Sequence, residues 1–296
     1  MVEFQQKFSN EKACLAYLEQ VRWGDKAICP HCGSIKTYKF KSGLLFKCGD
    51  CRKQFTAKVG TIFSDSKVPL YKWFLAIYLA TSLKRGISSV QLCKYIGVTQ
   101  KTSWFMLQRI RFALEKSGNG WLLENEVEID ETYIGGKGYN RAKELRSTTN
   151  SYNKETVMGM LERGGRAKIY HVKSSGSRAL LPPIQTNVKP DTRIFTDEYG
   201  VYKNLSKMGY PHDTVHHRTM QFRKGNAHTQ NIEGFWSHMK RGINGVYYHV
   251  SPKHLQMYCN EYQYRYNTRQ MTDIERFSEW FGYSLCGLTY KELING

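Results

Sequence analysis

Runs of apolar residues predict a series of strands in the second half of the chain. The first run extends from Val127 to Ile134, is rich in β-branched residues and is followed at once by paired glycines. Runs of this length and composition, bounded by turn-forming residues, are typical of buried strands. Helical patterns follow the strands, which indicates an α/β or α+β domain. The remaining predicted strands cover 156–161, 168–172, 193–196 and 214–216.

Apolar residues at steps of three and four predict amphipathic helices on either side of the strands. Such spacing places the apolar residues on one face, which can then be buried. Ser9 is the expected cap of the first of these helices, and Pro69 precedes the second. The helical patterns cover 10–21, 70–83, 228–241, 255–266 and 277–293.

Two helices joined by a tight turn are predicted between Ser88 and Arg111. The first begins at Ser88 or Ser89 and ends at Gly97, and the second begins at Thr99. This is the layout of a helix-turn-helix whose second helix enters a major groove, but an ordinary helical hairpin has the same pattern. On the second helix we expect Gln100, Lys101, Ser103 and Gln108 to point outward, and Trp104, Leu107 and Ile110 to point inward.

The charge of the chain favours the DNA-binding alternative. Lys and Arg number 44 against 25 Asp and Glu, which gives a formal net charge of +19. A protein this basic usually binds a polyanion, with nucleic acid first and an anionic membrane surface second. An apolar fraction of 41% over 296 residues is enough for two or three folded domains and excludes a disordered chain. We therefore expect double-stranded DNA as the partner.

Neither a membrane-spanning segment nor a secretory signal is evident. No run of eighteen apolar residues occurs, and the N-terminal MVEFQQKFSNEK lacks the layout of a signal peptide. We expect no membrane partner and a cytoplasmic protein, associated with the nucleoid in a bacterial host.

Half of the eight cysteines form two CxxC pairs in a short segment. Candidate strands at 37–40 and 44–47 lie between the pairs, so the pairs face each other across a hairpin. In a reducing compartment this pattern predicts a structural Zn²⁺ site rather than disulfides, and the metal supplies the folding free energy of a ribbon that has almost no core. His31 is either a surface neighbour or a substitute ligand. The expected ligands are Cys29, Cys32, Cys48 and Cys51.

Three acidic residues, far apart in the sequence, are candidates for a catalytic metal site. Asp130 lies inside the first predicted strand, where a carboxylate is costly unless it is hydrogen-bonded, binds a metal or turns to solvent. Asp197 follows the strand at 193–196, and Glu233 lies beside the buried face of a predicted helix. If they converge, they can hold two Mg²⁺ or Mn²⁺ ions for an in-line phosphoryl displacement. Of the acidic neighbours, only Glu128 shares the face of Asp130.

The motifs around these residues resemble those of a known family. The segments EIDETYIGG, FTDEYGVY and HTQNIEGFWSHMKR, which contain Asp130, Asp197 and Glu233, resemble the DDE triad of transposases with a ribonuclease-H-like catalytic domain. Lys240 matches the basic residue frequent two turns after the glutamate. Together with CPHC…CGDC, the chain is similar to bacterial insertion-sequence transposases related to the Merlin superfamily. This resemblance implies a Mg²⁺-dependent transposase that recognises terminal inverted repeats, cleaves with water and joins a free 3′-hydroxyl to target DNA.

The third metal ligand has two candidates. Some relatives use Asn there, and Asn231 lies on the same predicted helix as Glu233. We expect Glu233, because a carboxylate carries the negative charge that an amide lacks.

The basic, glycine-rich segment 135–150 is expected to lie along phosphates, and His216, His217 and His228 are interpreted as structural or surface histidines rather than as groups that position water or phosphate. The expected DNA or phosphate contacts are Lys240, Arg241, Lys101 and Gln100.

The expected fold is α+β and multidomain, and the expected assembly is a homodimer or higher oligomer. Two alternatives to a transposase remain: a DNA-binding protein whose acidic residues are relics, and a repair or recombination nuclease that does not join 3′ ends. The expected domains are an N-terminal helix (1–24), a zinc ribbon (25–60), a helix-turn-helix region (66–116), a ribonuclease-H-like mixed α/β domain (124–272) and a C-terminal helical cap or oligomer contact (273–296).

Overall fold

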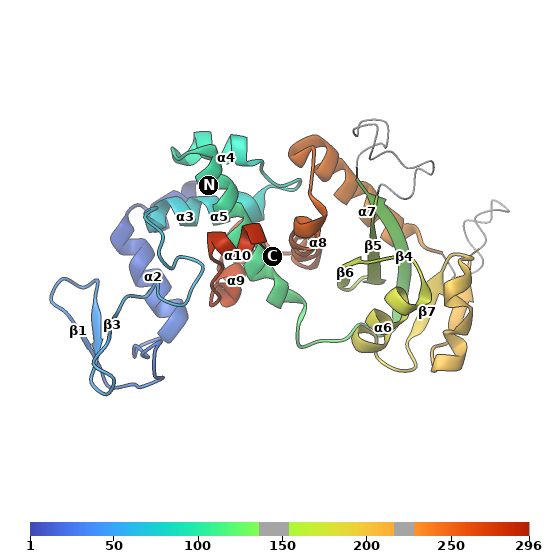
Figure 1. Cartoon of the computed structure of the whole chain (residues 1–296), viewed down its shortest axis with the longest axis horizontal. Helices are drawn as coiled ribbons and strands as arrows, with labels where there is room; N and C mark the ends of the chain where they lie inside the picture. Colours follow the sequence, from blue (N-terminus) through green and yellow to red (C-terminus); the bar gives the residue numbers. More distant parts are fainter. Residues whose placement is uncertain (136–153, 216–227, 296) are drawn as a thin grey trace. The chain divides into compact units, whose positions relative to one another are not determined.

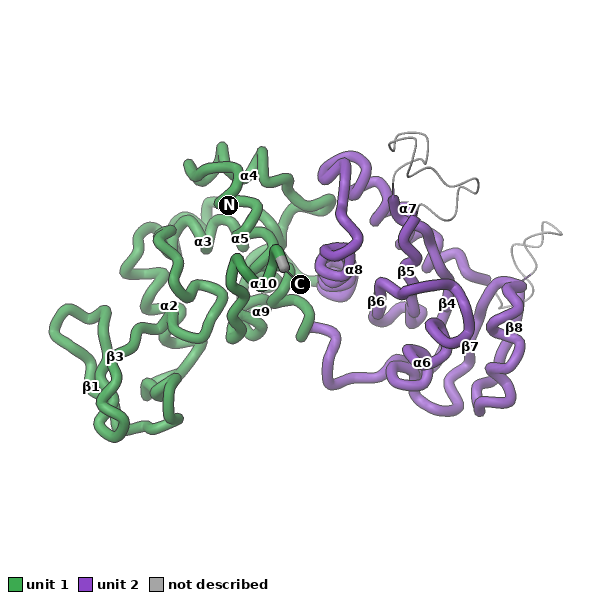
Figure 2. The backbone as a smooth tube through the Cα atoms, in the orientation of Figure 1, with its two compact units in different colours: residues 1–116, 271–296 green, residues 117–270 purple. Residues whose placement is uncertain are grey.

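The computed structural model describes residues 1–135, 154–215 and 228–295. The chain divides into two compact units, shown in Figure 2: unit 1 comprises residues 1–116 and 271–296, and unit 2 comprises residues 117–270. Unit 1 is therefore built from both ends of the chain. The segment expected to lie along phosphates, 135–150, falls outside the described residues from position 136 onward, and so do His216 and His217.

Unit 1 begins with two helices and a small antiparallel sheet. The helices are α1 (Val2–Lys7) and α2 (Glu11–Trp23), and Asn10 rather than the predicted Ser9 caps α2, because its side chain accepts a hydrogen bond from the backbone N–H of Ala13 at 3.0 Å. The sheet adds a third strand to the predicted hairpin. Its strands, in spatial order, are β1 (Thr37–Lys39), β2 (Phe46–Cys48) and β3 (Gln54–Phe55).

The ribbon has a small aromatic core that the sequence did not indicate. The rings of Phe46 and Phe55 stack with their centroids 5.5 Å apart, and Trp23 from the end of α2 meets Phe46 edge-on at 5.2 Å. Such ring pairs contribute beyond the apolar area that they bury. The ribbon is thus packed against α2 as well as closed by its cysteines.

Two helices joined by a tight turn follow with the predicted boundaries, a layout that fits both a helix-turn-helix and an ordinary helical hairpin. Helix α3 (Leu70–Ser82) precedes α4 (Ser89–Ile96) and α5 (Gln100–Ala113). The side chains of Ser88 and Thr99 cap α4 and α5 by accepting backbone N–H groups three residues on. Gly97 ends α4 with φ of 61°, a left-handed conformation that glycine adopts without steric cost.

The outward face of α5 is smaller than predicted. Gln100 and Lys101 are exposed, as expected, but Ser103 and Gln108 are fully buried, and the predicted inward residue Trp104 is only half-buried. The Ser103 hydroxyl donates to the backbone carbonyl of Ser89 at 2.6 Å and so joins the two helices. The second half of α5 is buried on all sides, which the pattern of one helix alone cannot reveal.

The C-terminal segment completes the core of unit 1. It contains α9 (Asp273–Trp280) and α10 (Tyr290–Asn295). Phe277 and Phe281 are fully buried, and their rings lie 5.8 and 4.8 Å from that of Phe74 on α3. The segment expected as a C-terminal cap or oligomer contact therefore packs inside the unit that also contains the zinc ribbon and the helix-turn-helix.

Unit 2 is built on a mixed five-stranded sheet of the ribonuclease-H-like type (Figure 1). Its first three strands form an antiparallel meander, and the last two run parallel to the central first strand. The strands match the five predicted ones, with shifts of one or two residues at most boundaries. In spatial order they are β6 (Ala167–Val172), β5 (Glu155–Glu162), β4 (Glu126–Ile134), β7 (Arg193–Thr196) and β8 (His212–Thr214).

Helices cover both faces of this sheet. Helix α6 (Ser177–Asn187) packs with Val127 and Ile129 on one face, and α7 (Gln230–Gly242) and α8 (Pro252–Asn267) pack on the other. The sequence did not predict α6, because it contains Pro182 and Pro183, which normally interrupt helices. The zinc ribbon and the mixed sheet confirm the predicted α+β multidomain class. Among the described helices, none is long and apolar enough to cross a membrane.

Candidate active site

Asp130 lies on the central strand of unit 2 and is bonded to helix α7. Its position on β4 faces Gly159 across the antiparallel ladder with β5. The indole N–H of Trp236 donates to Asp130 Oδ2 at 2.9 Å. This hydrogen bond fixes the direction of the carboxylate on the face of the sheet that α7 covers.

Gly159 makes this contact possible. A Cβ added at position 159 would lie 2.6 Å from the Trp236 ring and 2.9 Å from the side chain of Ile232. The indole therefore lies against bare backbone of β5. A lone glycine inside an apolar strand often marks such a close approach, and the segment Met158-Gly159-Met160 carried this signal in the sequence.

Glu128, two residues before Asp130 on the same strand face, holds the start of α7. Its side chain is fully buried, and Oε2 accepts hydrogen bonds from the backbone N–H groups of Asn231 at 3.0 Å and Ile232 at 3.1 Å. Its Oε1 accepts from the Asn231 amide at 2.8 Å and from Arg163 Nε at 2.8 Å. Glu128 is therefore satisfied within the protein and does not lie open beside Asp130.

The cap of α7 consequently differs from the prediction. We expected the side chain of Thr229 or Asn231 to cap the helix, but neither accepts a backbone N–H of its first turn. A carboxylate supplied by β4 does so instead, and its charge is favourable at the positive end of the helix dipole. The Thr229 hydroxyl donates to Glu233 Oε1 at 3.0 Å.

Asp197 and Glu233 lie on elements that adjoin β4. Asp197 directly follows β7, the parallel neighbour of β4, is half-buried, and accepts the backbone N–H of Tyr199 at 3.0 Å. Glu233 is exposed in the first turn of α7, which packs on β4 and β5. A strand tip, a central strand and a helix N-terminus thus supply the three predicted acidic side chains.

The charges of Asp197 and Glu233 act on the Asp130 carboxyl. Burial, then the negative charge of Asp197 and to a smaller extent that of Glu233, raise the pKa of Asp130 to about 6, against the opposing effect of the Trp236 hydrogen bond. Within the described ranges, no lysine or arginine forms an ion pair with Asp130. The oxygens of the three carboxylates nevertheless do not all lie within 4.8 Å of one another. Among the described residues, the four cysteines Cys29, Cys32, Cys48 and Cys51 are the only potential metal-ligand group that close together.

Glu131 points to the opposite face of the sheet, as strand alternation predicts. It accepts a short hydrogen bond from the hydroxyl of the fully buried Tyr202. Burial raises the pKa of Glu131 to about 7; the Tyr202 hydrogen bond opposes this shift, and the charges of Asp130 and Asp197 add to it. A fourth acidic group therefore lies within electrostatic reach of the site without facing α7.

Basic residues follow Glu233 along α7. Lys240 is exposed seven residues after Glu233, which places it nearly two turns further along the same side of the helix. Arg241 is also exposed, and its Nε donates to the backbone carbonyl of Ser237 at 3.2 Å. On the helix-turn-helix, Gln100 donates to the Ser89 hydroxyl at 2.8 Å and the Lys101 ammonium lies 5.1 Å from the ring centre of Tyr290.

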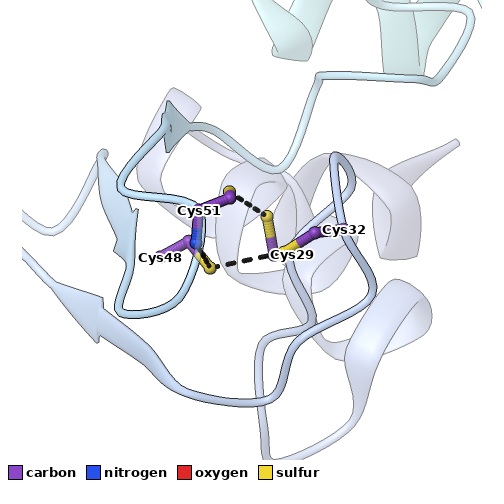
Figure 3. Close-up of side chains that lie close together, drawn as sticks. All are labelled: Cys29, Cys32, Cys48 and Cys51. Carbon is purple, nitrogen blue, oxygen red and sulfur yellow. Dashed lines mark hydrogen bonds between the residues drawn. The ribbon is translucent and has the colours of Figure 1, made fainter.

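The four predicted zinc ligands lie together in unit 1 (Figure 3). The sulfur atoms of Cys29 and Cys51 are 3.7 Å apart, and those of Cys32 and Cys48 are 3.6 Å apart. Zinc–sulfur bonds of about 2.3 Å in a tetrahedron require sulfurs roughly 3.8 Å apart, so the group fits a structural Zn²⁺ ion. His31 is exposed and outside the cysteine group, which agrees with a surface neighbour.

Comparison with known proteins identifies both parts of the chain. A family model described as an ISXO2-like transposase domain matches residues 122–267, and one described as a transposase zinc-ribbon domain matches residues 9–54. A Halobacterium salinarum protein described as uncharacterized, in transposable element ISH50, is 28% identical over 273 residues, which cover 87% of this chain and 91% of that protein.

Two further comparisons, one of sequence and one of structure, differ in how much they say about this chain. An uncharacterized transposase-like protein of Haemophilus influenzae is 31% identical over 112 residues, which cover 36% of this chain and 86% of that protein. The Mos1 strand transfer complex is similar at a TM-score of 0.27 and 11% identity, over 67% of this chain and 70% of that one, which is too loose a likeness to bear on the fold or the site. On the strength of the domain matches and the sequence relatives, this chain belongs to the family of transposases that combine an N-terminal zinc ribbon with an ISXO2-like transposase domain.

Proposed function

We propose that this protein is a DNA transposase that binds the terminal inverted repeats of its insertion sequence and catalyses metal-dependent DNA cleavage and strand transfer. Asp130, Asp197 and Glu233 are its catalytic triad. The observation that carries the proposal is the placement of these side chains on β4, directly after the neighbouring β7 and at the start of α7, which bonds to Asp130 through Trp236. In agreement with this placement, burial and the charges of the other two acidic residues raise the pKa of Asp130 to about 6. Negative charge gathered at one edge of a sheet, without a protein cation on Asp130, is typical of a site for divalent ions.

The donor set suits Mg²⁺ or Mn²⁺. All three side chains offer carboxylate oxygens, which hard divalent ions prefer, and a divalent ion bound there would activate the attacking oxygen and stabilise the leaving oxygen. Glu233 is the better third ligand. The amide of Asn231 already donates to Glu128, and the residue has no charge to contribute, whereas Glu233 adds to the negative charge that Asp130 experiences.

The surrounding residues then have distinct roles. The Trp236 indole donates to Asp130 Oδ2 and so holds the carboxylate on the face of the sheet that α7 covers. The Thr229 hydroxyl donates to Glu233 Oε1, so a metal ion that binds this oxygen would compete with that hydrogen bond. Lys240 and Arg241, exposed further along α7, bind phosphate groups of the DNA beside the reacting one.

DNA recognition belongs to unit 1. Only the first turn of α5 is open to a major groove, so Gln100 and Lys101 are the residues that reach DNA. The ribbon adds phosphate contacts, because its exposed strands and turns carry several lysines. With a net charge of +19, the chain associates with double-stranded DNA on the nucleoid, and a homodimer or higher oligomer brings two transposon ends together.

A cleavage assay with a matched control tests the proposal. The substrate is a supercoiled plasmid carrying the DNA that flanks the coding sequence on both sides, with Mg²⁺ present. We expect nicking and strand-transfer products from the wild type, a loss of at least a hundredfold in Asp130→Asn, and wild-type activity in Glu124→Gln, which changes an exposed acid paired with Lys189. Equal nicking by wild type and Asp130→Asn would remove Asp130 from the mechanism.

The same assay separates the two alternatives. Tight DNA binding without any Mg²⁺-dependent cleavage would indicate a DNA-binding protein whose acidic residues are relics. Cleavage without joining of 3′ ends to a second plasmid would indicate a nuclease of repair or recombination.

A further inference from the structure

A buried cluster connects the three elements that carry the candidate triad. Its centre is the ion pair between Glu128 and Arg163, with Arg163 Nε 2.8 Å from Glu128 Oε1. The Glu128 side chain has no exposed surface and that of Arg163 is 12% exposed. Arg163 follows β5 and also pairs with Glu126 at 3.2 Å, so the guanidinium bridges two residues of β4.

Each of the three acidic residues has a neighbour, two positions earlier, in this cluster. Glu128 itself is two positions before Asp130. Phe195, two positions before Asp197, lies with its ring centre 3.9 Å from the Arg163 guanidinium. Asn231, two positions before Glu233, gives both its backbone N–H and its amide to Glu128.

The cluster also holds the start of α7 from a second side. Arg163 Nη2 donates to the backbone carbonyl of His228 at 2.9 Å, directly before the helix, while Glu128 accepts the N–H of Ile232 within its first turn. The ion pair thus touches β4, β7 and α7 together. A displacement of either partner would shift the three acidic residues relative to one another.

We propose that Glu128 and Arg163 are positioning residues that set the spacing of Asp130, Asp197 and Glu233. The proposal rests on the function proposed above. Glu128 is not a metal ligand, because both of its oxygens are occupied by protein donors in a fully buried position. Nor is stability a sufficient reason for the pair, since a buried ion pair contributes little more than an apolar pair of the same volume, whereas its directional hydrogen bonds specify one arrangement.

The test measures metal binding directly, apart from activity. Mn²⁺ binding to the zinc-loaded full-length protein is followed by electron paramagnetic resonance in the wild type, Glu128→Gln and Arg163→Lys. Glutamine keeps the size of Glu128 but cannot accept all four hydrogen bonds, and lysine keeps the charge of Arg163 but cannot bridge Glu126, Glu128 and the His228 carbonyl. We expect an Mn²⁺ dissociation constant at least tenfold higher in each variant, in the range of about 10–100-fold that loss of a residue supporting metal ligands causes.

Cleavage kinetics add a second readout. In both variants the Mn²⁺ concentration for half-maximal cleavage should rise by the same factor as the dissociation constant, and saturating Mn²⁺ should restore part of the rate. The double variant should bind Mn²⁺ no more weakly than the weaker single variant, because both residues act through one cluster.

Asn187→Ala is the matched control. It removes the acceptor of the Tyr170 hydroxyl and one of the two acceptors of the buried Lys168, which keeps the Trp121 carbonyl, so it destabilises unit 2 on the α6 side of the sheet without touching α7. Its Mn²⁺ affinity should equal that of the wild type. A similar loss of affinity in Asn187→Ala would mean that general destabilisation explains the effect, and would overturn the proposal.

Asp130→Asn separates failure of this proposal from failure of the proposed function. If Asp130→Asn loses Mn²⁺ binding and cleavage while Glu128→Gln and Arg163→Lys match the wild type, the positioning proposal is wrong and the triad stands. If Asp130→Asn also matches the wild type, the triad itself is wrong. Should Glu128→Gln fail to fold by circular dichroism, the affinity of Arg163→Lys decides.

Discussion

Gly159 lies directly opposite Asp130 in the β4–β5 ladder, and the ring of Trp236 occupies the space that a side chain at position 159 would fill. The same ring donates its N–H to Asp130. One missing side chain on β5 therefore determines how closely α7 approaches the sheet and where the Asp130 carboxylate points. This relationship gives a sharp mutational test.

Gly159→Ala should damage unit 2 at this contact. The added methyl group would have to displace Trp236 or Ile232, and overpacking of this kind costs about 1–3 kcal/mol of unfolding free energy. DNA cleavage should fall further than the stability loss explains, because the indole can no longer hold Asp130. Chemical denaturation and the plasmid cleavage assay measure the two effects.

Gly234→Ala is the control for this substitution. No atom lies within 4 Å of a Cβ added there, and the position is inside α7, so the change should stabilise the helix by up to about 1 kcal/mol. Wild-type cleavage and stability in Gly159→Ala would show that Trp236 can repack and does not fix Asp130.

Removal of zinc should unfold the ribbon while unit 2 stays folded. The aromatic core around Trp23 is small, and the binding free energy of a structural zinc ion, on the order of 10 kcal/mol, is folding free energy. A chelator should therefore expose trypsin sites within residues 25–60 and leave fragments of unit 2 intact. Cys48→Ser should lose zinc in an elemental assay, whereas Cys14→Ser, a buried thiol outside the group, should retain it. Resistance of residues 25–60 to trypsin after chelation would contradict the zinc site.

DNA binding should depend on Lys101 but not on Gln108. Lys101→Ala removes an exposed cation at the start of α5, so affinity should fall for all duplexes alike, and the slope of log K against log salt should decrease by about 1. Gln108→Leu changes a buried amide whose polar atoms have no partner in the described structure, and it should leave binding unchanged. Fluorescence anisotropy with a labelled flanking duplex over a salt series measures both. Weaker binding in Gln108→Leu but not in Lys101→Ala would indicate that Gln108 contacts DNA, as the sequence pattern of α5 predicted.

Arg109 should be important for the stability of unit 1. Its buried guanidinium donates to the backbone carbonyls of Leu288, Ile62 and Ser64, and burial lowers its pKa. Arg109→Met would leave these buried acceptors without a donor and should cost about 3 kcal/mol. Thermal unfolding should show a lower midpoint for unit 1, and Lys67→Met, at an exposed cation of the same unit, should not change it. An unchanged midpoint in Arg109→Met would mean that water replaces the guanidinium.

Local signals in the sequence predict much of this structure. The strand at 193–196 coincides with β7, and the caps Ser88 and Thr99 begin the two helices as expected. The four cysteines meet, since two CxxC pairs across a hairpin leave few other arrangements. In each case the physical cause lies within a few residues: alternation, a capping hydroxyl or ligand spacing.

The misinterpreted positions depend on contacts between distant segments. Ser103 and Gln108 are polar on an amphipathic helix, yet other parts of unit 1 bury them. Glu128 was expected only to share a strand face with Asp130, but it caps a helix 103 residues later in the sequence. The Pro182-Pro183 pair concealed α6, which nevertheless forms because packing of Leu180 and Ile184 against the sheet outweighs the lost backbone bonds.

The return of the chain to unit 1 makes the folding of the first segment of the protein depend on the last one to be synthesised. Phe277 and Phe281, which pack against Phe74 of α3 in the core of unit 1, are translated only after the whole of unit 2. A premature stop codon or frameshift within unit 2 therefore also removes part of the core of unit 1. If the proposed function holds, truncated products would lack part of the core of unit 1 and would compete poorly with the intact protein for DNA.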